Sequence, residues 1–124
     1  MKALHSFVHQ SREGKITSLS MYLADSGQAL NMSVSEKIND TSEIIRVKFN
    51  LNEIAAMSKL NTWSTYHSFE KEGKTSETRI NWNTPFFSVE KEGKKIAIKF
   101  TDAEIYGFQM TLETAFQELI RRGK

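Results

Sequence analysis

The sequence predicts an α+β fold in which a four-stranded antiparallel sheet followed by a helix occurs twice. Three observations support it: apolar residues alternate with polar ones along most of the chain, similar glycine turns separate the alternating runs, and two segments carry helix-capping signals. Alternation with period two is typical of strands in antiparallel sheets that bury one face. The 124 residues predict a single domain, 1–124, with an internal repeat of 1–61 and 62–124.

The first half is expected to hold four strands. In the second of them, Leu19, Met21 and Leu23 alternate with a polar face that includes Tyr22. Turns of the type basic-Glu-Gly-Lys recur three times in the chain, and their glycine supplies the positive φ that a tight hairpin needs. The expected strands are Lys2–His9, Lys15–Ala24, Ala29–Lys37 and Glu43–Phe49.

The second half repeats this pattern, with strands expected at Trp63–Glu70, Lys74–Trp82, Phe86–Glu90 and Lys95–Phe100. Each half then enters a helix through a capping signal, Asn50 with Glu53 and Thr101 with Glu104. Each signal directly follows a strand that ends in Lys-Phe, and the two glutamates are 51 positions apart. We therefore interpret the chain as two copies of one unit.

The composition excludes several classes of function. The chain has no cysteine, which excludes disulfide frameworks, zinc knuckles and thiol catalysis. Its formal net charge of +2 excludes binding by bulk charge, although a local basic patch is compatible with it. No apolar run approaches the ~20 residues of a membrane span, and the N-terminus becomes polar too early for a signal peptide. We expect a cytoplasmic protein that does not bind a membrane.

No set of residues predicts catalysis. His5 and His9 share a strand face, but four strand residues separate them by ~13 Å, too far to chelate one metal. The chain has no Gly-x-Ser-x-Gly nucleophile motif, and Gly73-Lys74-Thr75 lacks the upstream glycine of a phosphate-binding loop. We expect no enzyme activity, no cofactor and no metal site.

Basic and aromatic residues share the predicted polar faces, which favours nucleic-acid binding. Cations can follow a phosphate backbone while exposed rings stack on unpaired bases. The candidate residues are Arg12, Lys15, Tyr22, Arg46, Lys48, Trp63, Tyr66, Lys74, Trp82, Phe86, Lys95 and Lys99, and Phe7 is a further candidate ring. Two alternatives stay open. The lysines could be ordinary solvent-facing charges of the sheets, and the rings could be buried in a protein–protein interface.

The order of elements resembles the Whirly and positive-cofactor-four-like superfamily of single-stranded DNA-binding proteins, and it is similar to the guide-RNA-binding proteins of kinetoplastid mitochondria. Phe49–Ile54 looks like the start of the first Whirly helix, and Phe100–Glu104 looks like the start of the second. Gly14-Lys15 lies where Whirlies carry a Lys-Gly-Lys-Ala-Ala-Leu stretch that lines the nucleic-acid surface. Ile16–Ser18 departs from the small residues of that stretch.

The resemblance implies two sheets splayed away from helices that build the core, protomers assembled through those helices, and single strands bound along the sheets. Together with the broad apolar surface of the second helix, it predicts a homo-oligomer, a tetramer or a dimer. The expected function is binding of single-stranded DNA with low sequence specificity, in a process such as replication or recombination. The alternatives are an RNA-binding protein of the same fold and a protein–protein interaction module without nucleic acid.

Overall fold

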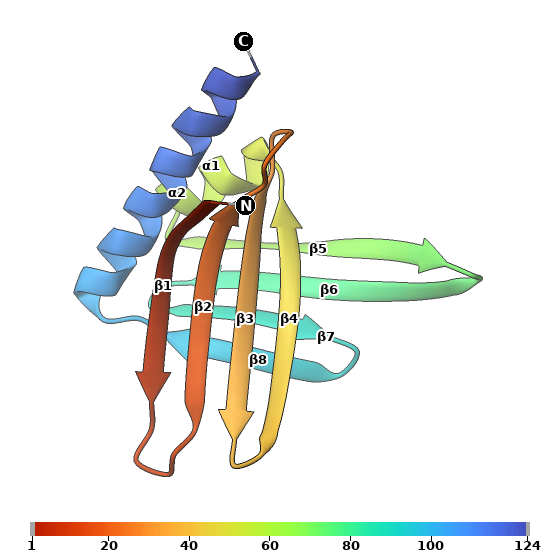
Figure 1. The fold of residues 1–124 in the computed structure, drawn as a ribbon, viewed down its shortest axis with the longest axis vertical. Coiled ribbons are helices and arrows are strands. Elements are labelled where there is room, and N and C mark those ends of the chain that lie inside the picture. The colour runs from red at the N-terminus through yellow and green to blue at the C-terminus, as the bar shows by residue number, and fades with distance from the viewer. Residues whose placement is uncertain (1, 124) are drawn as a thin grey trace.

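The computed structural model describes residues 2–123 and confirms the predicted fold class (Figure 1). Both sheets are antiparallel and keep their strands in sequence order, and every strand end lies within two residues of its predicted position. The first half comprises β1 (Lys2–Gln10), β2 (Ile16–Leu23), β3 (Leu30–Ile38), β4 (Thr41–Phe49) and α1 (Leu51–Lys59). The second half comprises β5 (Thr62–Lys71), β6 (Lys74–Asn83), β7 (Phe86–Lys91), β8 (Lys94–Lys99) and α2 (Asp102–Arg122).

The strands of the two sheets cross each other, and the inner faces of the sheets meet around β2, β3, β4, β7 and β8 (Figure 1). The end of the β5–β6 hairpin that carries its turn extends beyond β4, so part of the second sheet has no sheet opposite it. The helix α1 packs against α2, where the Gln109 side chain donates to the carbonyls of Met57 and Leu60, each at 3.1 Å. Each sheet therefore has one face toward the core and one outer face toward solvent.

A cluster of aromatic rings lies in the core beside α2. Phe108 of α2 has its ring centroid 5.0 Å from that of Trp82, 5.0 Å from that of Phe100 and 5.5 Å from that of Phe87. Phe7 of β1 is also buried, with its ring 5.0 Å from that of Phe100. The second sheet, β1 and α2 are therefore packed through one continuous set of rings.

The two predicted capping boxes are confirmed. The Asn50 side chain accepts from the Glu53 backbone, and the Glu53 carboxylate accepts from the Asn50 backbone at 3.0 Å. Thr101 and Glu104 repeat this exchange at the start of α2. Each pair supplies partners to backbone N–H groups that the helix itself leaves unpaired.

Each capping glutamate also contacts a histidine from the other half of the chain. The Nε2 atom of His67 in β5 lies 2.6 Å from Oε2 of Glu53, and Nε2 of His9 in β1 lies 2.8 Å from Oε2 of Glu104. In one pair the first half supplies the glutamate and the second half the histidine, and in the other pair the reverse holds. Each helix start is thus fixed against a strand of the opposite sheet.

The His9–Glu104 pair gives a prediction for acid unfolding. Burial raises the pKa of Glu104, but hydrogen bonds from the Thr101 backbone and from His9, with the charge of protonated His9, outweigh burial and lower it. Because the native-state pKa lies below the ordinary value of 4.5, the ionised Glu104 carboxylate stabilises the fold at pH values above 4.5. This stabilisation is lost as the pH falls through the native-state pKa. Because glutamine also completes a capping box, the difference in unfolding free energy between wild type and Glu104→Gln should shrink as the pH falls from about 7 to about 3.

Urea titrations across this pH range measure that difference. The control is Asp102→Asn, which removes an exposed carboxylate from the same helical turn. A difference for Glu104→Gln that stays constant with pH would contradict the role given to its ionised carboxylate.

Candidate functional site

The outer face of the first sheet is basic and, within residues 2–123, has no carboxylate at a strand position. The register pairs Asn31 with Lys48 and Ser33 with Arg46, so both cations of β4 lie on this face, while Glu36 lies on the inner face. The outer positions of β2, β3 and β4 are Ile16, Ser18, Ser20, Tyr22, Asn31, Ser33, Ser35, Lys37, Ser42, Ile44, Arg46 and Lys48. The face thus combines cations with short, uncharged side chains.

Three of the predicted residues on this face lie together around one hollow, which we call the β4 notch. It has a volume of about 570 Å³ and is lined by Tyr22, Asn31, Met32, Ser33, Arg46, Val47, Lys48 and Phe69. Neither Arg46 nor Lys48 has an ion-pair partner in the described part of the chain. Phe69 was not among the predicted residues, although a ring only two residues before the turn at Lys71 indicated a candidate for contact with a ligand.

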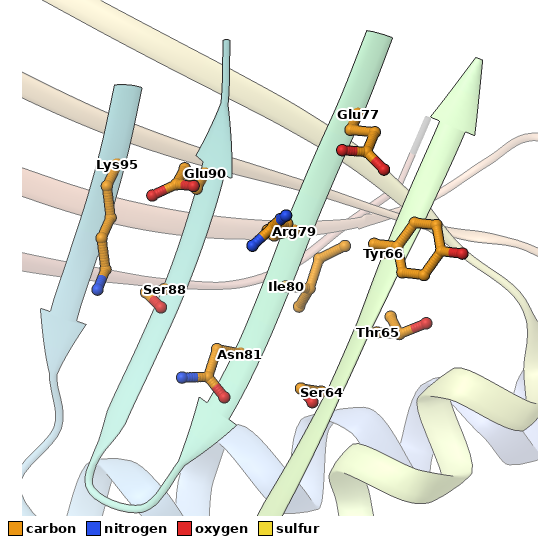
Figure 2. A pocket seen from close by; sticks show the side chains of 10 residues that line it. All are labelled: Ser64, Thr65, Tyr66, Glu77, Arg79, Ile80, Asn81, Ser88, Glu90 and Lys95. Atoms are coloured by element: carbon orange, nitrogen blue, oxygen red, sulfur yellow. The ribbon is translucent and has the colours of Figure 1, made fainter. Parts of the chain in front are cut away.

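The outer face of the second sheet is also hollowed, as Figure 2 shows with ten side chains from β5, β6, β7 and β8. Of the predicted residues, Tyr66 and Lys95 line this hollow. Arg79 of β6, the strand between β5 and β7, lines it as well and was not among the predicted residues. Glu90 is the register partner of both Arg79 and Lys95. Because Glu77 and Glu90 lie among its cations, this surface is closer to neutral than the outer face of the first sheet.

Phe86 and Lys99 form a separate contact on the same face of the second sheet. The Nζ atom of Lys99 lies 5.8 Å from the centroid of the Phe86 ring, and the two residues are register partners. This is a cation–π distance. Phe86 remains exposed, so its ring is accessible beside a cation, as the prediction requires.

The other predicted residues do not join these surfaces. Arg12 is exposed in the β1–β2 turn and Lys74 at the β5–β6 turn, whereas Lys15 lies 3.3 Å from the largely buried Glu36. Lys94 of β8 contacts the same glutamate at 3.5 Å, so Glu36 connects β3 to the other sheet. The charge of Lys15 is therefore partly compensated within the protein.

The predicted exposure of two tryptophans and Phe7 is corrected. Trp82 is completely buried, and its Nε1 donates to the Leu60 carbonyl at 2.7 Å, so predicting it as a stacking ring was wrong. Trp63, its register partner, is half-buried on the inner face and packs against the core. Phe7 is buried as well, while its neighbour Val8 is exposed. Trp82 and Phe7 therefore serve packing, because a base cannot reach a ring enclosed by side chains.

The apolar residues of α2 are mostly used within the chain. Phe108, Leu112, Ala115 and Leu119 are buried, while Tyr106 and Met110 are exposed. The homo-oligomer stays a prediction.

Two further findings concern sites of other kinds. No group of three or more His, Asp or Glu side chains in residues 2–123 is placed to hold a metal ion. None of the helices in this part of the chain has the length and apolar character to cross a membrane.

Comparison with known proteins identifies a similar fold but no similar sequence. No family model matches the chain, and no curated protein matches it in sequence. The solved structure of the plant transcriptional regulator PBF-2 superposes with a TM-score of 0.62 and 14% identity. The match covers 97% of this chain and 84% of the plant protein. At that identity the likeness concerns the fold, which extends over nearly the whole chain.

Proposed function

We propose that this protein binds single-stranded nucleic acid, with DNA as the preferred ligand, with little sequence specificity and without a catalytic step. The observation that carries the proposal is the outer face of the first sheet. There Arg46 and Lys48 are opposite Ser33 and Asn31, and within residues 2–123 they have no ion-pair partner and the strands of this face carry no carboxylate on it. The fold shared with a plant transcriptional regulator supports it.

The mechanism combines charge and stacking. Arg46 and Lys48 contact phosphates and release counterions, which gives affinity without reading sequence. Rings beside cations, the half-buried Tyr22 on the first sheet and the exposed Tyr66 and Phe86 on the second, provide π-faces that accept any base. An unpaired strand exposes these base faces, whereas a duplex keeps them stacked inside, so the mechanism favours single strands.

The test is a binding titration with labelled oligo-dT, oligo-U and a duplex at about 50 mM and about 200 mM salt. Single strands should bind more tightly than the duplex, and affinity should fall at least about sevenfold between the two salt concentrations if two phosphates are contacted. Comparing oligo-dT with oligo-U separates the DNA-binding form of the proposal from the RNA-binding one. Absence of binding at the lower salt concentration would contradict the proposal and favour the protein-interaction module.

A further inference from the structure

We propose that Phe69 is a base-stacking residue, and that unpaired bases of the bound strand enter the β4 notch between Phe69 and the outer face of the first sheet. This inference rests on the proposed function and adds to it one ring and one location. It assigns the ligand contact to a residue on the inner side of the second sheet.

The exposure of Phe69 follows from where β5 extends. Alternation in β5 places Trp63, His67 and Phe69 on one side, and the register with β6 identifies this as the inner side because Trp63 is opposite the buried Trp82. Trp63 and His67 are half-buried, whereas Phe69 is 61% exposed. The difference arises because the β5–β6 pair continues past β4 (Figure 1). Phe69, two residues before the end of β5, lines a hollow together with residues of β4.

The residues across the notch suit a nucleotide. Tyr22, Asn31 and Lys48 form one row across β2, β3 and β4, and Ser33 and Arg46 lie in the next row. Lys48 and Arg46 supply two cations for successive phosphates, and Asn31 and Ser33 supply hydrogen-bonding groups for base edges. A ring, two cations and small polar groups around one hollow are the components of a site that takes a base with its phosphate.

The two rings of the notch contact different bases. Tyr22 lies on β2 and Lys48 on β4, so two strand spacings, about 10 Å, separate their backbones, and Phe69 belongs to β5 of the other sheet. Two rings that sandwich one base are about 7 Å apart, twice the stacking distance of about 3.4 Å, which is less than this strand separation. One base therefore stacks on Phe69 and another on Tyr22, while the backbone between them passes Arg46 and Lys48.

An acidic or neutral protein segment fits the notch less well. Arg46 and Lys48 line the hollow from two successive outer positions of β4, and no carboxylate is among the described residues that line it. A protein interface typically buries a contiguous apolar centre with charges at its rim. In the β4 notch the two cations line the hollow itself, where a polynucleotide can offer phosphates to them.

The experiment compares Phe69→Ala and Phe69→Trp with wild type in binding to oligo-dT at about 50 mM salt. Removing a stacking ring should weaken binding about 5- to 150-fold, and the tryptophan variant should restore affinity because indole also stacks. The indole introduced at position 69 should be quenched as oligonucleotide is added. The control variants are Tyr106→Ala and Tyr106→Trp, which change a ring that is 69% exposed on α2 and lines neither hollow.

The outcomes separate the two proposals. If wild type does not bind oligo-dT, the proposed function fails and this inference fails with it. If wild type binds and Phe69→Ala binds equally well, with the indole at position 69 unquenched, this inference alone is overturned. Circular dichroism of each variant verifies the fold, and rescue by Phe69→Trp distinguishes lost stacking from a distorted β5–β6 pair.

Discussion

Replacing Trp82 with alanine should lower the free energy of unfolding by about 3–5 kcal/mol, the range for removing a large buried ring. Trp82 has no exposed surface, contacts the rings of Phe87, Phe100 and Phe108, and donates a hydrogen bond to the Leu60 carbonyl. The substitution leaves a cavity among these rings and removes one of the two side-chain hydrogen bonds to the Leu60 carbonyl, which keeps the bond from Gln109. Urea unfolding followed by far-ultraviolet circular dichroism measures the loss.

Two related variants separate packing from hydrogen bonding. Trp82→Phe keeps most of the apolar volume but removes one of the two donors to the Leu60 carbonyl, which costs about 0.5–1.5 kcal/mol because Gln109 still donates to it. Trp63→Ala removes a ring that is only half-buried, so its cost should be smaller than that of Trp82→Ala. A Trp82→Ala variant that is as stable as wild type and loses affinity for oligonucleotides would contradict a packing role for Trp82.

The double substitution of Arg46 and Lys48 by alanine should weaken binding of oligo-dT roughly 50-fold at about 50 mM salt. Each phosphate contact to a single strand contributes about 0.7 to the slope of log affinity against log salt, so the slope should decrease by about 1.4. Both residues are exposed and form no ion pair with any residue from 2 to 123, so the variant should unfold at the same urea concentration as wild type.

The matched comparison removes two charges from the second sheet, Lys95 and Lys99. The loss of affinity should be smaller, because Glu90 is opposite Lys95 and Lys99 lies over the Phe86 ring. Equal losses from both pairs would indicate that the strand follows the two sheets alike. An unchanged slope for the Arg46 and Lys48 variant would make these cations solvated surface charges.

Local sequence signals were enough to predict the elements. Strand alternation, the Glu-Gly turns and the capping boxes each depend on residues only a few positions apart. At Glu72-Gly73 and Glu92-Gly93 both residues have positive φ, the conformation that a two-residue hairpin turn with the right twist needs. Such features act before any tertiary contact forms, so the strand ends were predicted closely.

The positions of individual rings depend on features that a local pattern does not contain. A register shift in β1 between Ala3 and His5 changes which side chains face inward, so Phe7 is buried and Val8 exposed. Trp82 was predictable in principle, because it continues the inward series of Thr78 and Ile80 in β6. The exposure of Phe69 depends on how far one sheet extends past the other, which is set by the crossing of the sheets.

The two His–Glu pairs have a consequence for cooperativity. A chain made of two similar units could lose one while keeping the other, as local unfolding is common in proteins. Here the loss of β5 removes His67 from the cap of α1, and the loss of β1 removes both His9 from the cap of α2 and Phe7 from the shared rings. Unfolding of either half therefore destabilises the other. The two halves should unfold together in a single all-or-none transition rather than in steps.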